Sequence, residues 1–222
     1  MTNATLLPIL KWAGGKRKLS SKIIQHIPKD HNTYIEPFLG GGAVLLALQP
    51  NKAIVNDANT ELINVYNTVK TSPEDLIENL RKHEKQHSKE YYYKIRELDR
   101  TPSYKDLENI EKAGRFLYLN KTGYNGLYRV NRKGENNVPY GKYEKPNIVN
   151  EIAIRQLSDY LQTNEIQITS TDYQEPLKKA KPGDFVYLDP PYAPLSATSS
   201  FTNYTSEGFN LEKQIELRDQ CL

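Results

Sequence analysis

The chain of 222 residues is long enough for one domain of ordinary size, or for one domain that carries an insertion. Hydrophobic residues make up 37% of it and charged residues 26%, a balance that excludes a disordered chain. The longest apolar run, Ala43 to Leu48, is too short to span a bilayer, and the first residues do not form a secretory signal. The single Cys221 excludes a disulfide framework and a cysteine-built zinc site. We therefore expect a cytoplasmic protein with no membrane partner.

The net charge of +3 is too small to indicate a nucleic-acid partner, but its distribution is more informative. Between Lys121 and Lys145 there are six basic and two acidic residues, so this stretch alone carries +4. The chain also has 16 tyrosines, and aromatic rings among bases suit stacking on nucleobases. A solvated basic loop accounts for the charge equally well, so both interpretations stay open at this point.

The first 59 residues predict the opening of a doubly wound α/β sheet. A strand, a glycine turn, a helix and a second strand that ends in an acid follow one another, as in nucleotide-binding βαβ units. The pattern predicts a helix from Leu19 to Ile27, a strand from Tyr34 to Phe38, a turn at Gly40–Gly42, a helix from Ala43 to Leu48 and a strand from Ala53 to Val55.

From residue 59 to about residue 121 the pattern is helical, without a strand signal. Pro73, Ser88 and Ser103 mark helix starts, and the best-formed helix is expected from Tyr104 to Leu119. A stretch rich in Gly, Asn, Pro and Tyr, Thr122 to Asn147, follows as a loop.

The last third returns to the α/β pattern. We expect a helix from Glu151 to Leu161, strands from Ile166 to Ser170 and from Phe185 to Leu188, and an amphipathic helix around Leu211 to Leu217. The last strand is apolar and would form an edge of the sheet. The fold class is thus α/β, with residues 1–59 and 151–222 forming the sheet domain and residues 60–150 forming a mostly helical insertion.

The glycine turn predicts a place where a ligand approaches the backbone at a helix N-terminus. Gly40 and Gly42 fit the dinucleotide pattern G-x-G-x-x-G, but Leu45 stands where the third glycine belongs, which disfavours a dinucleotide. Asp57 ends the second strand, where a carboxylate can accept both hydroxyls of a ribose. A tight turn followed by an aspartate N-cap is the structural alternative.

Asp189-Pro190-Pro191-Tyr192 directly follows the predicted strand that ends at Leu188. The two prolines stiffen the turn and remove two backbone donors, so acceptor oxygens dominate it. The Asp189 carboxylate and the Pro190 carbonyl could hold both protons of an exocyclic amine and direct its lone pair at an electrophile, while Tyr192 could stack on the base. A plain Asp-Pro turn is the alternative.

These residues resemble the deoxyadenosine methylase (Dam) family of DNA adenine N6-methyltransferases, whose members include GATC-type enzymes. The resemblance covers nearly the whole chain and keeps the family's order of motifs. It is carried by KWAGGKR at Lys11–Arg17, EPFLGGGAV at Glu36–Val44, NDAN at Asn56–Asn59, YLNKTGYNGLYRVNRKGENNVPYGKY at Tyr118–Tyr143, and YLDPPYAPLSATSSFTNY at Tyr187–Tyr204.

The resemblance implies a Rossmann-like sheet, S-adenosylmethionine as methyl donor and no metal. Asp189, Pro190, Pro191 and Tyr192 match the catalytic turn. By the same match, the residues expected around the donor are Trp12, Lys16, Phe38, Gly40, Gly42, Asp57, Asp172, Tyr173 and Asp189.

The resemblance also makes residues 60–150 the target-recognition domain for double-stranded DNA, with GATC as the expected site. The target adenine would have to leave the duplex, because its amine cannot reach a donor while it is paired. The residues expected to contact DNA are Lys11, Tyr124, Asn125, Arg129, Pro139, Tyr143 and Ser196, with Arg129 reading a guanine and Tyr124–Asn125 entering the duplex.

Members of that family continue beyond the point that corresponds to Leu222, so the C-terminal strands of the sheet are expected to be missing here. This leaves a second function open, a DNA- and S-adenosylmethionine-binding protein that does not turn over. Completion of the fold by another chain is a further possibility, and the sequence predicts no oligomeric state.

His83-Glu84-Lys85-Gln86-His87 matches H-E-x-x-H, the signature of zinc metalloproteases. Two histidines four residues apart on a helix can share a metal ion. The surrounding sequence is polar on all sides and supplies no evident third ligand, so a solvated helix is the favoured interpretation and a zinc protease the remote one.

Overall fold

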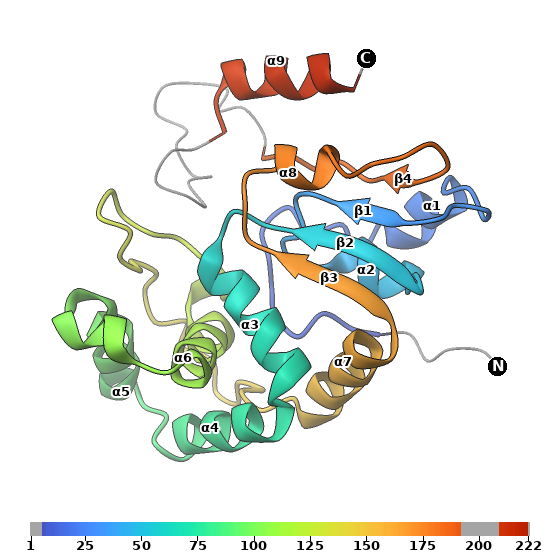
Figure 1. Ribbon diagram of the computed structural model, residues 1–222. Helices are drawn as coiled ribbons and strands as arrows, with labels where there is room; N and C mark the ends of the chain where they lie inside the picture. The colour runs from blue at the N-terminus through green and yellow to red at the C-terminus, as the bar shows by residue number, and fades with distance from the viewer. Residues whose placement is uncertain (1–5, 192–208, 222) are drawn as a thin grey trace.

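The computed structural model describes residues 6–191 and 209–221. In this part of the chain a parallel sheet has the strand order β3-β2-β1-β4, and Figure 1 shows its arrows pointing the same way. Parallel strands place all their carboxyl ends at one edge, which is where such sheets bind ligands. The strands are β1 (Tyr34–Glu36), β2 (Lys52–Asn56), β3 (Glu165–Thr169) and β4 (Phe185–Val186).

The register brings the two central strands together along buried faces. Tyr34 pairs with Ala53 on one side and with Phe185 on the other, and Val55 pairs with Ile168. Tyr34, Ala53 and Val55 are almost fully buried. The α/β sheet predicted from the sequence is therefore confirmed.

Short helices flank the strands of this sheet. Helix α1 (Ser20–Gln25) precedes β1, α2 (Ala43–Leu48) connects β1 to β2, and α8 (Gln174–Leu177) lies between β3 and β4. Helix α9 (Leu211–Gln220) lies beside α8 in Figure 1, and the hydroxyl of Tyr173 donates a hydrogen bond to the Lys213 carbonyl across that contact. The sequence did not predict α8, which is only four residues long and has no helical periodicity.

The connection from β2 to β3 contains the long helices. In Figure 1, α3 and α7 run below the sheet, whereas α4, α5 and α6 gather further from it. The connection consists of α3 (Thr60–Thr71), α4 (Pro73–Lys85), α5 (Lys89–Arg96), the 3-10 turns η1 (Glu97–Arg100) and η2 (Pro102–Asp106), α6 (Asn109–Thr122), the 3-10 turn η3 (Tyr124–Gly126) and α7 (Glu151–Thr163).

The prediction of a helix from Tyr104 to Leu119 was wrong at its start. Residues 102–106 form the 3-10 turn η2, and Leu107 and Glu108 are extended, with ψ angles of 143° and 155°. Glu108 then caps α6 in a reciprocal capping box with Glu111, which fixes the true helix start at Asn109. The starts at Pro73 and Ser88 are confirmed, because α4 begins at Pro73 and the Ser88 hydroxyl accepts from the Tyr91 N–H.

One continuous core joins the sheet to the helices. Val55 in β2, Leu62 in α3, Leu117 in α6 and Leu157 in α7 all belong to the same buried cluster. Residues 60–150 share this core with the rest of the chain, so the division of the chain into two domains stays a prediction. Among the residues that the structure describes, no helix is both long and apolar enough to cross a membrane.

Candidate active site

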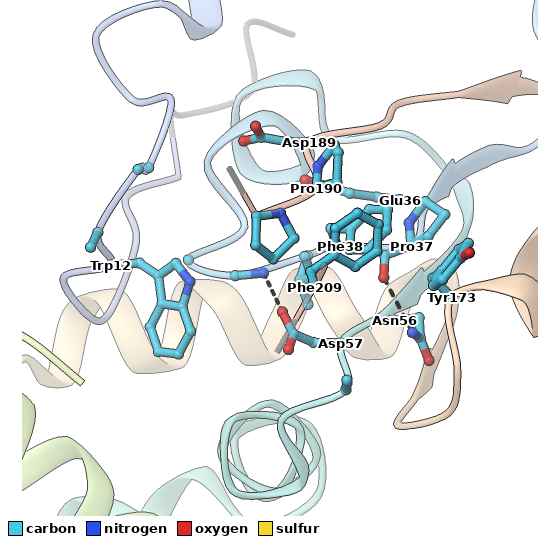
Figure 2. Close-up of a pocket in the computed structure, with 18 of the residues that line it drawn as sticks. Trp12, Glu36, Pro37, Phe38, Asn56, Asp57, Tyr173, Asp189, Pro190 and Phe209 are labelled. Carbon is cyan, nitrogen blue, oxygen red and sulfur yellow. Dashed lines mark hydrogen bonds between the residues drawn. The ribbon is translucent and has the colours of Figure 1, made fainter. Parts of the chain in front are cut away.

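A cavity of about 450 Å³ opens at the carboxyl ends of the strands. Its walls come from segments that are far apart in the sequence, and Figure 2 labels side chains from several of them. These segments are the N-terminal loop at 12–16, the β1–α2 connection, the end of β2, residues 127–129, the turn at Asp172–Tyr173, the residues after β4 and the start of the α9 segment at Phe209 and Lys213. This volume lies within the range of small-molecule sites.

The glycine turn forms the floor of the cavity, and two of its glycines have a left-handed backbone. Gly40 has φ +50° and Gly42 has φ +64°, a region that side chains other than glycine rarely adopt. A Cβ at Gly40 would lie 2.7 Å from the Trp12 ring, so the indole packs directly on this backbone. Gly42 is the N-cap of α2, and there a Cβ would meet the Tyr66 hydroxyl at 2.8 Å. Gly40 lines the cavity, whereas Gly42 packs behind it.

Asp57 holds the glycine turn in place from the end of β2. One carboxylate oxygen accepts a 2.9 Å hydrogen bond from the Gly40 N–H, as Figure 2 shows, and the other accepts one of 2.9 Å from the Asn59 N–H. Burial raises the pKa of Asp57, and the two N–H donors counteract that rise. Each oxygen keeps a lone pair, so the carboxylate can still accept from a ligand hydroxyl in the cavity.

Three aromatic rings form an apolar wall beside the glycine turn. Phe38 stacks on Tyr173 with ring centroids 5.4 Å apart, and Phe209 meets both rings edge-on. A flat apolar ligand such as a purine ring fits a wall of this kind. Phe38 and Tyr173 were predicted from the sequence, whereas Phe209 was not, because it lies more than 30 residues beyond Tyr173 and outside the motifs.

The Asp-Pro-Pro turn lines the same cavity at the end of β4. Both oxygens of Asp189 accept hydrogen bonds from the Lys16 ammonium, at 2.7 and 2.6 Å, and Lys16 also donates to the Gly14 carbonyl. The N-terminal loop is thereby fastened across the site to the turn. Pro190 and Pro191 line the cavity as well. Tyr192 lies outside the described residues.

Glu36 is a site residue that the sequence analysis did not single out. It ends β1, lines the cavity, and is 2% exposed. Its carboxylate accepts from the Tyr34 hydroxyl at 2.8 Å and from the Leu45 N–H. Burial, together with Asp189 and Asp57 nearby, raises the pKa of Glu36 to about 8. The available signal was an acid at the end of an apolar strand, directly before Pro37.

The predicted DNA-contacting residues gather beside the cavity rather than in it. Arg129 alone of this group lines the cavity, and its Nε donates to the Asn137 side chain at 2.6 Å. The Lys11 ammonium lies 4.8 Å from the centre of the Tyr143 ring. Tyr124, which is 52% exposed, donates its backbone N–H to the Pro139 carbonyl, and Asn125 follows it with φ +53°. Ser196 lies outside the described residues.

A stack of aromatic rings connects the two groups of residues. Trp12 lies 5.7 Å from Tyr128 and 6.4 Å from Phe116, with nearly parallel rings. Tyr128 immediately precedes Arg129, and Trp12 packs on Gly40, so the stack runs from the floor of the cavity to the basic loop. Tyr128 was not predicted, because nothing in the sequence indicates which of the 16 tyrosines meets Trp12.

The H-E-x-x-H segment has a packing role in this structure. His83 and His87 each place Nδ1 2.9 Å from a tyrosine hydroxyl, of Tyr91 and Tyr118 respectively. Burial lowers the pKa of His83 to about 4. Within residues 6–191 and 209–221, no three His, Cys, Asp or Glu side chains gather as metal ligands. The zinc-protease alternative is unsupported.

The fold and the site together define a nucleoside-binding α/β enzyme. A glycine turn follows the first strand, an acid ends the second, and a rigid acceptor turn follows the fourth, all around one cavity. A cavity of this kind, at the carboxyl ends of parallel strands, is typical of α/β enzymes that bind a nucleoside-containing ligand.

The comparisons with known proteins identify the family. The family model of the D12 class N6 adenine-specific DNA methyltransferases matches residues 12–222. The chain belongs to this family, and the resemblance seen in its motifs is confirmed.

Three relatives show how far the similarity extends. The type II methyltransferase M1.LlaDCHI of Lactococcus lactis subsp. cremoris is 49% identical over 96% of this chain and 75% of its own length. The type II methyltransferase M.MjaIII of Methanocaldococcus jannaschii is 42% identical over 95% of this chain and 77% of its own length. The DNA adenine methylase of Escherichia coli strain K12 is 39% identical over 95% of this chain and 73% of its own length.

Proposed function

We propose that this protein transfers a methyl group from S-adenosylmethionine to the N6 amine of adenine in double-stranded DNA, within GATC. The family membership supports the reaction class. The observation that carries the proposal is that Asp57 and Asp189, at the ends of two different strands, line one cavity. One carboxylate suits the donor and the other suits the acceptor, so both reactants can meet there.

The residues around the cavity fit the donor. A ribose hydroxyl can donate to Asp57, an adenine ring can lie on the wall of Phe38, Tyr173 and Phe209, and the glycine turn lets a ligand approach its backbone closely. The Asp57 carboxylate lines the cavity and accepts only backbone N–H groups, so its charge favours a cation such as the sulfonium group there. When bound, the donor supplies an electrophilic methyl group on a positively charged sulfur.

We assign the acceptor amine to the Asp-Pro-Pro turn. The lone pair of an adenine N6 amine is delocalised into the ring, which makes it a weak nucleophile. Hydrogen bonds from both amine protons to the Asp189 carboxylate and the Pro190 carbonyl would favour a tetrahedral nitrogen with a localised lone pair. Methyl transfer forms the nitrogen–carbon bond, breaks the sulfur–methyl bond and releases one amine proton, and we assign the acceptance of that proton to Asp189.

The acceptor adenine has to leave the duplex to reach Asp189. Its amine is paired inside the helix, and extrusion costs a few kcal/mol of lost stacking and pairing. We assign the entering group to Tyr124 and Asn125, since Tyr124 is an exposed aromatic ring beside the basic loop. Arg129, Pro139 and Tyr143 are proposed to read the bases, with Lys11 beside them on the same surface. Residues 60–150 are thus proposed as the target-recognition domain, in a protein that acts in the cytoplasm.

A single-turnover assay tests the proposal. The protein is mixed with S-adenosylmethionine and a duplex that contains one GATC site, and the product is digested with nucleases that cut only methylated or only unmethylated GATC. We expect methylated product from the wild-type chain and none from Asp189→Ala. Binding of donor and DNA without methylation would support the binding-protein alternative instead, and methylation at another sequence would contradict GATC.

A further inference from the structure

Asn120 is a buried side chain of α6 that the proposed function has not used. It is 3% exposed and lies in the last turn of the helix. Its side-chain oxygen accepts from the Lys11 N–H at 2.9 Å, and its amide nitrogen donates to the Lys11 carbonyl at 2.8 Å and to the Gly126 carbonyl at 2.9 Å. One amide therefore satisfies three backbone groups from two loops that are more than 100 residues apart.

The two loops that Asn120 joins also contact each other. Gly126 has φ +62°, and a Cβ there would lie 2.8 Å from the Lys11 Cβ, so only glycine lets the loops approach this closely. Asn125 before it is also left-handed, with φ +53°, a conformation that asparagine adopts more often than most residues with a side chain. The hydrogen bond from Asn120 to the Gly126 carbonyl constrains the turn that carries Tyr124.

Only an amide meets these three backbone groups. Two carbonyls and one N–H face the side chain, so it must supply two donors and one acceptor. An aspartate of the same size would set a carboxylate against two carbonyl oxygens, and a leucine would leave all three groups unsatisfied in a buried place. These three hydrogen bonds, which we call the Asn120 clasp, therefore require an amide side chain at this position.

We propose that Asn120 is a positioning residue for adenine extrusion. It fixes the Tyr124–Gly126 turn against the loop that carries Lys11, so that the exposed Tyr124 ring enters the duplex at a set distance from the Lys11–Tyr143 contact. Because Trp12 follows Lys11 and packs on Gly40, the same clasp sets this turn relative to the cavity. The inference rests on the proposed function and adds to it the residue that holds the entering group.

The test compares Asn120→Asp and Asn120→Ser on two DNA duplexes. In the first duplex the target adenine is paired, and in the second it faces an abasic position, where leaving the stack costs less. On the paired duplex we expect the single-turnover rate to fall by about tenfold or more, the order set by one disrupted buried hydrogen bond. On the abasic duplex we expect both variants to return to within about threefold of the wild-type rate.

A second readout follows extrusion itself. With 2-aminopurine in place of the target adenine, fluorescence rises when the base leaves the stack, and we expect a smaller rise with Asn120→Asp than with wild type. Asn164→Asp is the matched control, because it removes an amide that donates to the Tyr160 carbonyl far from the cavity, and it should behave as wild type. Donor binding by calorimetry reports whether the cavity is intact.

The outcomes separate this inference from the proposed function. An equal rate loss on both duplexes, a wild-type fluorescence rise in Asn120→Asp, or unfolding of both Asn120 variants would overturn the positioning role. If the wild-type chain neither methylates DNA nor raises the fluorescence, the proposed function itself fails.

Discussion

Three of the carboxylates that line the cavity, Glu36, Asp57 and Asp189, have different hydrogen-bond partners and therefore different properties. Asp57 accepts hydrogen bonds from two backbone N–H groups, and Asp189 accepts hydrogen bonds from the Lys16 ammonium. Glu36 is fully buried and accepts hydrogen bonds from a tyrosine hydroxyl and one backbone N–H. The hydrogen-bond donors favour the ionised form of Asp57 and of Glu36, whereas burial favours the neutral form of both. The arrangement therefore distinguishes an acceptor held by backbone N–H groups at Asp57, an acceptor paired with an ammonium at Asp189 and a carboxyl at Glu36 that keeps its proton to a higher pH.

For Asp57 we predict a loss of donor affinity. Asp57→Ala removes the proposed acceptor for the ribose hydroxyls and the partner of the Gly40 N–H. The donor Kd should rise, and the binding free energy should become less favourable by ~1–3 kcal/mol. Calorimetry with S-adenosylmethionine and no DNA measures this change. If kcat fell sharply while donor affinity stayed at the wild-type level, the assignment of Asp57 to the ribose would be wrong.

For Glu36 we predict a change in how stability depends on pH. The folded-state pKa of about 8 lies above the ordinary value of 4.5, so Glu36 contributes stability below pH 4.5 that is lost as the pH rises toward 8. The loss is about 1.4 kcal/mol per pH unit in that window. Glu36→Gln cannot ionise and should lack this loss.

Urea unfolding of both proteins at several pH values measures this effect. The stability of Glu36→Gln relative to wild type should increase between pH 5 and pH 8, by ~2–4 kcal/mol in total. Parallel pH profiles for the two proteins would show that Glu36 is already ionised in the folded state.

At the scale of elements, residues 128–138 form a hairpin-like loop that is held on helical supports. Val130 pairs with Asn136 near its tip, and the Asn136 N–H donates to the Asp99 carboxylate at 2.7 Å. The buried Arg115 of α6 binds the same carboxylate at 2.7 Å. The Tyr92 hydroxyl of α5 donates to the Val138 carbonyl at 2.9 Å. The helices thus present a basic loop in a defined conformation rather than as a flexible arm.

Arg129 lies at the base of this loop, and we predict that it reads a base. Its Nε and one Nη are held by Asn137, which orients the guanidinium next to the cavity. Arg129→Ala should weaken binding to the cognate duplex by ~1–3 kcal/mol and relax the preference at one base position. Methylation rates on duplexes with single substitutions in GATC measure this.

Lys133, exposed at the tip of the same loop, provides the comparison for Arg129. Lys133→Ala should weaken binding to all duplexes alike and reduce the salt dependence of binding. If Arg129→Ala gave this uniform pattern too, Arg129 would be a phosphate contact rather than a base reader.

At the scale of the whole molecule, the only tryptophan in the chain connects the cavity proposed for the donor to the surface proposed for DNA. Trp12 packs on Gly40, stacks on Tyr128 next to Arg129, and follows Lys11, which Asn120 holds. The loop that carries it is fastened across the cavity by the pairing of Lys16 with Asp189. Occupation of either site therefore changes the surroundings of one indole ring.

We predict that Trp12 fluorescence reports both ligands. Adding S-adenosylmethionine should change its intensity or emission maximum along a curve that gives the calorimetric Kd, and a later addition of cognate duplex should cause a second change. A donor titration that saturates by calorimetry without altering the emission would contradict the placement of Trp12 beside the donor.

Much of the site could be predicted from the sequence because its chemistry lies in short local motifs. The glycine turn, Asp57 after β2 and the Asp-Pro-Pro turn after β4 each combine a turn with the end of a strand, and parallel strands must end at one edge. Apart from the short α8, the order of strands and helices was equally accessible from periodicity. The start of α6 was not, because the extended Leu107 and the capping box at Glu108 override the helical pattern before them.

The sequence by itself determined the class of fold, the strand ends that carry the two acids and the family of enzymes. The tertiary structure alone decided the raised pKa of Glu36, the stack of Trp12 on Tyr128 and the Asn120 clasp. The physical reason is range: turns, caps and periodicity act between neighbouring residues, whereas burial and ring contacts depend on segments that meet only after folding.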